Sequence, residues 1–245
     1  MDAAATASGG SGPVLVASGI RKAYGHVHAL VGDNGAGKST LLKILAGASR
    51  PDEGKLFLNG EEVELQSPQR ARELGIETVY QDLALADDRS CAANVYIGRE
   101  LLRPGLLGRL GFIDRARMNE ATRARFQELS VPIVRVERPV RLLSGGQRQG
   151  VAIARAAIWA RHVLLLDEPT AALGVRQRGA VVALIERLRE LRLSVVLISH
   201  DIPEVLKVAD RVTILRQGQV VDSRAAKDVD VSWVIHAMVG EPANA

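Results

Sequence analysis

Three features that often decide the class of a protein are scarce in this sequence. The 245 residues include one cysteine, Cys91, so no disulfide can form within the chain, which fits a reducing compartment. No apolar run approaches the roughly 18 residues that a membrane-spanning helix needs. Aromatic residues make up 3% of the chain, and the arginine-rich stretch 115–125 lacks the aromatic side chains that stack on unpaired bases. We therefore expect neither a membrane span nor a nucleic-acid partner.

The remaining composition favours a soluble intracellular domain. Apolar residues make up 47% of the chain and charged residues 24%, which is enough material for the core of one or two domains. The formal net charge is only +4, and we interpret the dispersed arginines as a solvated surface. Residues 1–12 are small and polar and lack the charged start and apolar middle of a signal peptide, so we expect a disordered tail there.

Residues 32–39 have the sequence GDNGAGKS, which fits the phosphate-loop pattern G-x-x-x-x-G-K-[ST]. Glycines in such a loop let backbone N–H groups close around phosphate oxygens, and Lys38 would contact the β- and γ-phosphates. The hydroxyl of Ser39 suits one position of an octahedral Mg²⁺. The apolar run 27–31 predicts a strand before the loop, and 39–46 a helix after it, as the motif requires. The alternative is a glycine-rich turn before an ordinary helix.

A second candidate site follows the apolar run 163–166. Such a run predicts a strand buried on both faces, so Asp167 and Glu168 emerge at its carboxyl end, where open α/β sheets bind ligands. Asp167 could hold Mg²⁺ through its water shell. Glu168 could orient or deprotonate an attacking water molecule. The alternative role for Glu168 is to cap the turn that follows.

The segment 143–147 has the sequence LSGGQ, and with it the motifs resemble the ATP-binding subunits of ABC transporters over residues 14–240. Ser144 looks like a helix N-cap, and Gly145 and Gly146 leave backbone N–H groups free for a second anion site. The resemblance implies a head-to-tail dimer in which each ATP lies between one copy's phosphate loop and the other's signature helix. It also implies an α/β P-loop NTPase of ABC type spanning 13–245, with a mixed central sheet, an antiparallel β edge and a helical subdomain at about 82–150.

Three further positions match family motifs. Gln81, in the segment TVYQD, corresponds to the glutamine that contacts Mg²⁺ or the attacking water and begins the segment that meets the membrane partner. His200, in LISHD, corresponds to the histidine that reaches the γ-phosphate, although alone it could be a polar strand end. Tyr24 corresponds to the aromatic residue that stacks on adenine, with a core tyrosine as the alternative.

The resemblance thus implies three sets of site residues. Catalysis would involve Glu168, His200 and Gln81, and the metal would be held by Ser39, Gln81 and Asp167. The nucleotide would be bound by Tyr24, Gly32, Asn34, Gly35, Gly37, Lys38, Ser39, Thr40, Ser144, Gly145, Gly146 and Gln147.

The sequence departs from the family pattern at two places. Relatives have a further strand and turn between the adenine-stacking aromatic and the phosphate-loop strand, whereas here Tyr24 is followed almost directly by the strand 27–31. We expect this loss to expose a sheet edge and to displace Tyr24 from the base. At Gly174 most relatives have an aspartate that contacts the other subunit. The sequence AALG at 171–174 instead resembles the corresponding segment in the ATPases of ribose, xylose and fructose-type importers.

The resemblance implies an ATPase that converts ATP and water to ADP and phosphate and powers sugar import. It would work as a homodimer or with a paired ABC subunit, peripherally on the cytoplasmic face of the inner membrane. Its partners would be integral permease subunits and, indirectly, a periplasmic solute-binding protein. Two alternatives remain: a nucleotide-binding adaptor whose hydrolysis is impaired by the short segment 24–32, and a soluble ABC ATPase of DNA repair or translation.

Hydrophobic periodicity predicts the remaining elements. The segments 14–20 and 55–65 alternate as antiparallel strands, and Asn59-Gly60 favours a type I′ hairpin turn. Helical stretches interrupted by proline are expected over 82–142. Strands at 163–166 and 194–199 alternate with helices at 179–191 and 203–208 and imply a parallel sheet. A closing hairpin is expected over 211–222.

Overall fold

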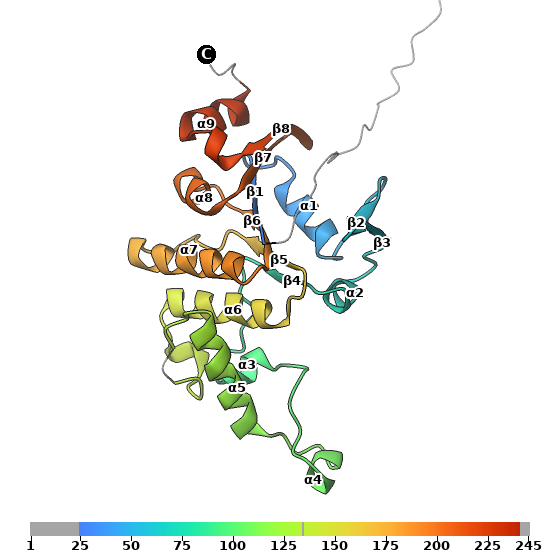
Figure 1. Ribbon diagram of the computed structural model, residues 1–245, viewed down its shortest axis with the longest axis vertical. Helices are drawn as coiled ribbons and strands as arrows, with labels where there is room; N and C mark the ends of the chain where they lie inside the picture. Colours follow the sequence, from blue (N-terminus) through green and yellow to red (C-terminus); the bar gives the residue numbers. More distant parts are fainter. Residues whose placement is uncertain (1–24, 134, 241–245) are drawn as a thin grey trace, which may run out of the picture.

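A six-stranded sheet in the order β4-β5-β6-β1-β7-β8 organises the chain (Figure 1). The structure is a computed structural model that describes residues 25–133 and 135–240, so Tyr24 and the predicted strand 14–20 lie outside the described residues. Neighbouring strands pair in parallel, except that β8 runs antiparallel to β7. The strands are β1 (Val27–Val31), β4 (Ile76–Val79), β5 (Val163–Asp167), β6 (Ser194–Ile198), β7 (Arg211–Arg216) and β8 (Gln219–Ala225).

The sheet is mostly parallel because its central strands are apolar on both faces. Every residue of β1 and β6 is buried, and so are residues 163–166 of β5. Polar residues inside the sheet are paired, since the ring nitrogen Nε2 of His28 lies 2.7 Å from Oγ1 of Thr213. The predicted strands at 27–31, 163–166 and 194–199 and the closing hairpin are therefore confirmed.

Helices cover both faces of this sheet (Figure 1). Alternate residues of β1 serve different cores: Leu30 packs with the α1 side chains, whereas Ala29 and Val31 belong to the core that includes α6, α7 and α8. The helices are α1 (Lys38–Leu45), α2 (Pro68–Glu73), α3 (Cys91–Val95), α4 (Leu106–Arg109), α5 (Arg115–Glu128), α6 (Gly145–Trp159), α7 (Val175–Glu190), α8 (Ile202–Val208) and α9 (Val231–Val239), with 3₁₀ turns at Val140–Leu142 and Ala226–Asp228.

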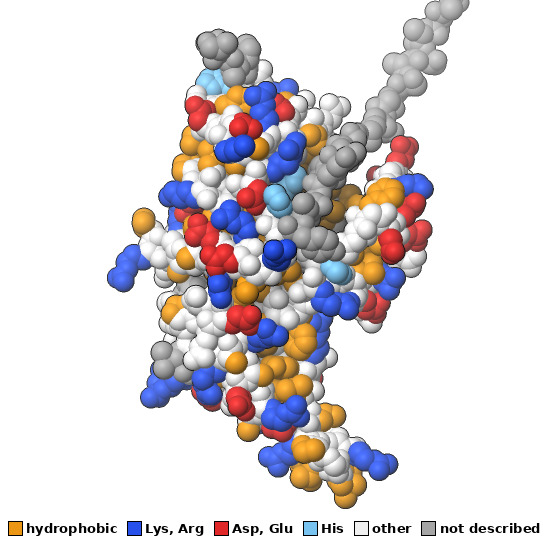
Figure 2. Space-filling view, viewed as in Figure 1, with side chains coloured by type: hydrophobic (Ala, Val, Ile, Leu, Met, Phe, Trp, Pro, Cys, Tyr) orange, Lys and Arg blue, Asp and Glu red, His pale blue; other side chains and the backbone are white. Residues whose placement is uncertain are grey.

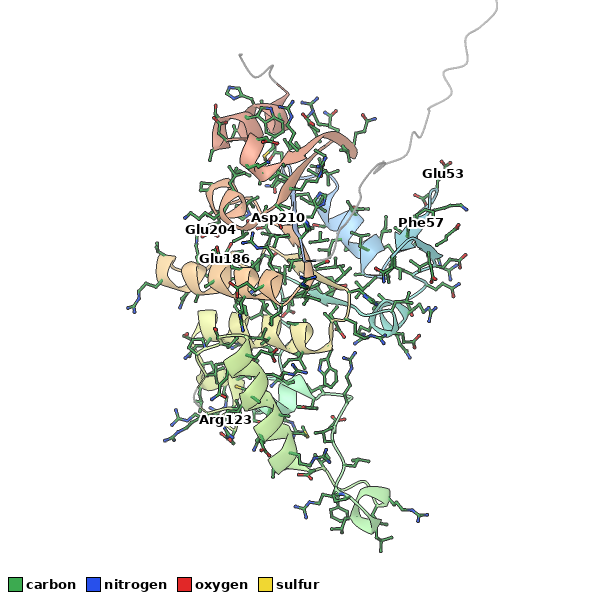
Figure 3. All side chains as sticks on the ribbon, viewed as in Figure 1. Glu53, Phe57, Arg123, Glu186, Glu204 and Asp210 are labelled. Carbon is green, nitrogen blue, oxygen red and sulfur yellow. The ribbon has the colours of Figure 1, made fainter. Side chains whose placement is uncertain are left out.

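A separate hairpin pairs β2 (Leu56–Leu58) with β3 (Glu61–Val63). Its turn has positive φ at Asn59 (56°) and Gly60 (88°), as a type I′ turn requires, so the predicted turn is confirmed. Among the described residues this hairpin forms a two-stranded sheet of its own, and the expected open edge stays a prediction because the segment 14–24 lies outside them. Phe57 points away from the body of the protein and is 63% exposed (Figure 3).

The stretch 82–142 contains helices with breaks between them, as predicted. Among the described residues of this stretch lie the helices α3, α4 and α5 and the 3₁₀ turn Val140–Leu142, with loops and turns between them where proline and glycine interrupt the chain. Helix α6 extends across residue 150, so that boundary is not an element end, and the subdomain division stays a prediction. Across the ranges that the structure describes, no helix combines the length and apolar character needed to cross a bilayer.

The phenylalanines allow a matched test of this packing. Phe126 on α5 is 1% exposed, so Phe126→Ala should lower the free energy of unfolding by about 3–5 kcal/mol through lost burial and a cavity. The same truncation at exposed Phe57 should cost under about 0.5 kcal/mol. Urea unfolding followed by circular dichroism measures both, and equal losses at the two sites would contradict the assigned core.

Candidate functional site

The sheet topology brings the predicted catalytic segments to one edge. Strands β4, β5, β6 and β1 are parallel neighbours, with Val79 opposite Leu166, Asp167 opposite Ile198, and Leu30 opposite Ile198. Their carboxyl ends therefore lie side by side, and predicted site residues lie at or just beyond them: Gln81, Asp167 with Glu168, His200 and Gly32. This is the edge at which open α/β sheets bind ligands.

The phosphate loop turns tightly between β1 and α1. Gly35 (φ 79°) and Gly37 (φ 101°) have left-handed backbone conformations that side chains disfavour. At Gly32 an added Cβ would overlap the carbonyl oxygen of Leu215. Lys38 is buried, and its Nζ donates hydrogen bonds to the carbonyl oxygens of Gly32 (2.7 Å) and Asp33 (2.9 Å). The loop thus wraps around its own lysine.

The start of α1 is open to an anion. Its N-cap is Gly37, which makes no side-chain cap, so among the described residues no side chain caps the first N–H groups of the helix. Ser39 and Thr40 in the first turn are exposed, as are Asn34 and Gly35 in the loop. The positive end of the helix dipole and the buried ammonium of Lys38 both favour negative charge here.

Two carboxylates with different environments lie at the end of β5. Burial raises the pKa of Asp167, the adjacent Glu168 raises it further, and Lys38 and Lys43 act in the opposite direction. Glu168 has a left-handed backbone (φ 50°), a conformation that residues other than glycine rarely adopt. Oε2 of Glu168 lies 2.7 Å from Nδ1 of His200, whose side chain is 71% exposed. The predicted base and the predicted histidine are therefore in contact.

The loop containing His200 is tied to the loop 171–174 by an arginine that sequence reasoning missed. Arg178 on α7 donates from Nε to the carbonyl oxygen of Leu173 (2.8 Å) and from Nη1 to Oδ2 of Asp201 (2.7 Å). Asp201 also caps α8 through Glu204 N–H. No motif marks Arg178, and only its position one turn into a helix after the AALG segment could have drawn attention to it.

Gln81 is exposed beyond the end of β4, at the beginning of a segment held by α6. Arg155 donates from its two terminal nitrogens to the carbonyl oxygens of Ala84 (2.7 Å) and Leu83 (2.8 Å), and Arg148 pairs with Asp87 at 2.6 Å. Arg148 and Arg155 are seven residues apart, a spacing that places both on one helix face.

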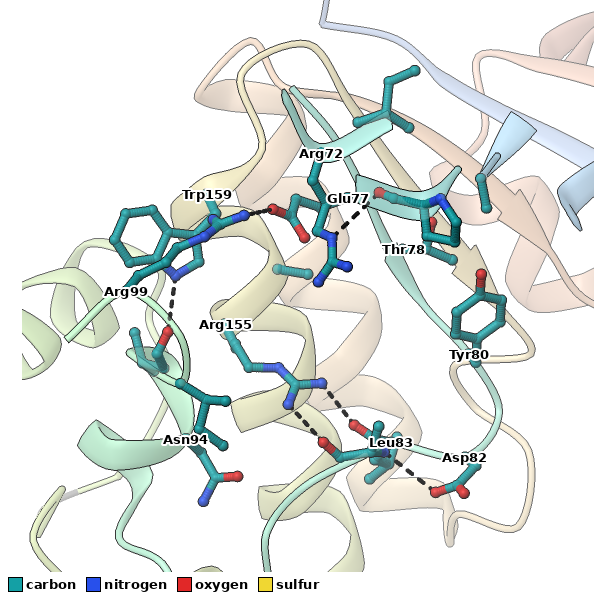
Figure 4. Close-up of a pocket in the computed structure, with 17 residues that line it drawn as sticks. Arg72, Glu77, Thr78, Tyr80, Asp82, Leu83, Asn94, Arg99, Arg155 and Trp159 are labelled. Carbon is teal, nitrogen blue, oxygen red and sulfur yellow. Dashed lines mark hydrogen bonds and ion pairs between the residues drawn. The ribbon is translucent and has the colours of Figure 1, made fainter. Parts of the chain in front are cut away.

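A pocket of about 390 Å³ lies beside this segment (Figure 4). It lies between β4 and the helices α3 and α6. Arg99 borders it, pairing with Glu77 at 2.9 Å and lying over the ring of Trp159 at 4.7 Å. Tyr80, Asp82 and Leu83 also line the pocket, so the segment that follows β4 forms one of its walls.

The signature segment begins α6. Ser144 Oγ accepts a hydrogen bond from Gln147 N–H (3.3 Å), and Gln147 Oε1 accepts one from Ser144 N–H (3.0 Å), so the predicted N-cap is confirmed as a capping box. Ser144 and Gly145 are exposed, and an added Cβ on Gly146 would press on the side chain of Gln177. In the described ranges no hydrogen bond or ion pair joins this segment to the phosphate loop.

Comparison with known proteins decides the family. The family model for ABC transporters matches residues 20–171. The chain belongs to the ABC transporter family. It is 44% identical to a fructose import ATP-binding protein of Rhizobium meliloti, covering 93% of this chain and 94% of that protein. It is 40% identical to a xylose/arabinose import ATP-binding protein of Sulfolobus acidocaldarius, covering 87% of this chain and 83% of that protein.

Further ABC proteins resemble the chain over part of their length or in fold alone. A ribose import ATP-binding protein of Rubrobacter xylanophilus is 38% identical over 99% of this chain, which spans 49% of that protein. The structure of cbiO1 from Clostridium perfringens, part of an ABC transporter complex, has a TM-score of 0.75 at 24% identity, covering 93% of this chain and 88% of that one. The predicted ABC fold with its mixed sheet is confirmed.

The raised pKa of Asp167 makes a prediction about stability. The folded chain holds this proton more tightly than the unfolded chain, so ionised Asp167 destabilises the fold at neutral pH, and this cost disappears as pH falls. Asp167→Asn should therefore raise the urea midpoint of the nucleotide-free chain at pH 7, with no difference below the ordinary pKa of 3.8. The exposed Asp52→Asn is the control, and a lower midpoint for Asp167→Asn at pH 7 would contradict the assignment.

Proposed function

We propose that this chain is the ATP-hydrolysing subunit of an ABC importer for a simple sugar. The observation that supports hydrolysis best is the pairing of Glu168 with His200 at the same sheet edge as the phosphate loop. The sugar class rests on the fructose import and xylose/arabinose import relatives, which align over most of their lengths.

The phosphate loop is suited to the triphosphate of ATP. The ammonium of Lys38 would exchange the carbonyl oxygens of Gly32 and Asp33 for β- and γ-phosphate oxygens, and the uncapped start of α1 would add backbone N–H donors. Gly32, Asn34, Gly35, Gly37 and Thr40 would line the same cradle. Tyr24, proposed to stack on adenine, lies outside the described residues.

The donors near this cradle suit Mg²⁺. The hydroxyl of Ser39 and the carboxylate of Asp167 are hard oxygen ligands, and Gln81 could add an amide oxygen. Among the described residues no cluster of three or more His, Cys, Asp or Glu could hold a metal ion, which fits an ion that depends on phosphates and water for its other ligands. When bound, the ion would neutralise charge that develops on the phosphates.

Hydrolysis requires a base for the attacking water, and Glu168 is placed for that role. Its carboxylate would accept the water proton at Oε2, the atom that now contacts His200. His200 is mostly exposed, so its ring can move toward the γ-phosphate and leave Glu168 to the water. Gln81, at the end of the neighbouring strand, would position that water molecule.

We infer a head-to-tail dimer from the second anion site. Ser144, Gly145 and Gln147 lie at a helix start that has no hydrogen bond or ion pair to the phosphate loop within the described residues. A partner copy would bring its own Ser144-Gly145-Gly146 backbone to the γ-phosphate. The closed dimer would then depend on the γ-phosphate and would open after hydrolysis.

The pocket beside the segment that follows Gln81 is the proposed docking site for an integral permease subunit on the cytoplasmic face of the inner membrane (Figure 4). The solute would reach the permease through a periplasmic binding protein and never contact this chain. An adaptor without hydrolysis is disfavoured because Glu168 and His200 are present and in contact. No observation favours a role in DNA repair or translation.

Replacement of the base tests the proposal. Glu168→Gln should lower phosphate release from Mg²⁺-ATP by about 10²-fold or more, because a general base contributes that much, while ATP binding and ATP-dependent dimer formation persist. The control is Glu61→Gln on the exposed strand β3, which should keep wild-type turnover. Equal turnover in the wild type and Glu168→Gln would contradict hydrolysis at this site, and a Glu168→Gln variant that stays monomeric with ATP would contradict the dimer.

The arginine clamp on the segment after Gln81 makes a separate prediction. Arg155→Ala removes the donors to Leu83 and Ala84, so amide exchange of residues 82–88 should accelerate. Turnover should fall several-fold, up to about 10²-fold, because Gln81 loses its position, with little change in KM for ATP. Arg123 on α5 (Figure 3) forms an ion pair with Glu137 at the surface, and Arg123→Ala, which breaks that pair, is the matched control. Unchanged exchange in Arg155→Ala would refute the clamp.

A further inference from the structure

A small projecting lobe, residues 102–113, displays an unusual number of apolar side chains. It contains α4 and projects from the end of the molecule far from β8 and α9 (Figure 1). Its large apolar side chains are 40% to 71% exposed. They are Leu102, Leu106, Leu107, Leu110, Phe112 and Ile113.

Backbone hydrogen bonds within the lobe hold its two ends together, and the apolar side chains point outward. Leu102 and Ile113 form an antiparallel bridge at its base. Arg103 N–H donates to the carbonyl oxygen of Phe112 (2.9 Å), and Asp114 N–H donates to that of Leu101 (2.6 Å). At Gly108 an added Cβ would overlap the carbonyl oxygen of Arg103. The lobe is thus an ordered turn whose backbone hydrogen bonds are made within the lobe itself.

The charge of the lobe is of one sign. Arg103 and Arg109 are both exposed, and no acidic residue lies between residues 101 and 113. Within the described residues neither guanidinium has a hydrogen bond or an ion pair. On the neighbouring α5, Arg123 and Arg125 pair with glutamates. Figure 2 shows apolar and basic side chains together at this tip.

We propose that the lobe binds the surface of a bilayer that contains anionic lipid. Leucine side chains of an amphipathic segment enter the boundary between headgroups and acyl chains, and arginines beside them pair with lipid phosphates. A protein partner fits less well, because a stable interface buries about 800 Å² on each side and this narrow convex lobe offers no groove for one. The two arginines without ion pairs complement the negative charge of anionic headgroups, which favours lipid over a protein partner.

The position of the lobe along the chain agrees with this assignment. Arg99, which lines the proposed permease pocket, lies shortly before Leu102, so the lobe extends from one wall of that pocket. The lobe would contact lipid next to the permease. Only this orientation rests on the proposed function, since lipid binding requires neither ATP nor the permease.

Sedimentation of the full chain with vesicles tests the proposal. The chain should bind vesicles of phosphatidylcholine with phosphatidylglycerol and not vesicles of phosphatidylcholine alone. Leu106→Ser with Leu107→Ser and Leu110→Ser should weaken partitioning at least about tenfold. Arg103→Gln with Arg109→Gln should weaken it about fivefold per arginine and reduce its salt dependence.

The control removes exposed apolar surface elsewhere. Ile235→Ser with Val239→Ser on α9 should leave vesicle binding unchanged. ATP turnover without lipid should equal that of the wild type in both lobe variants, which separates lost lipid contact from misfolding and from failure of the proposed enzyme. The proposal is overturned if the wild type stays in the supernatant with anionic vesicles, if the lobe variants bind as well as the wild type, or if the lobe instead mediates lipid-independent self-association.

Discussion

Parallel pairing of β4, β5, β6 and β1 is the constraint on which the rest of the structure depends. It gathers the ends of segments that are far apart in sequence, so that Gln81, Glu168, His200 and the phosphate loop meet at one edge. The pairing in turn requires strands that are apolar on both faces and helices that cover each face. A slip of one residue in β1 would exchange Leu30 with Ala29 and Val31 between two cores, so the packing fixes the register that positions the site.

Arginines connect the loops at this edge to the starts and faces of helices. Arg178 joins the carbonyl of Leu173 to Asp201, next to His200, while Arg155 and Arg148 join α6 to the segment after Gln81. Because α6 begins with the signature segment, a rotation of that helix moves the pocket wall and the signature together. Helix α6 would thus provide a mechanical link between the proposed permease surface and the proposed dimer surface.

Local patterns were enough to predict part of this structure. The strands β1, β5 and β6 were predicted from apolar runs. The turn at Asn59-Gly60 and the cap at Ser144 were predicted because these residue types strongly prefer such positions. Contacts such as Arg155 with Leu83, which are 72 residues apart in sequence, depend on tertiary packing that no local pattern encodes. Local patterns also predicted helical stretches interrupted by proline over 82–142, but not where α3, α4 and α5 begin and end.

A bound nucleotide would replace several of the interactions at this site. Lys38 donates to its own loop carbonyls, burial raises the pKa of Asp167, and Glu168 contacts His200 from a left-handed backbone. A polyanion with its cation would draw Lys38 toward phosphate and favour ionised Asp167. If the γ-phosphate also attracts His200, Glu168 becomes free for water only when ATP is bound. The base would therefore be released by the same phosphate that it helps to cleave, which ties activation of the site to occupancy by the correct ligand.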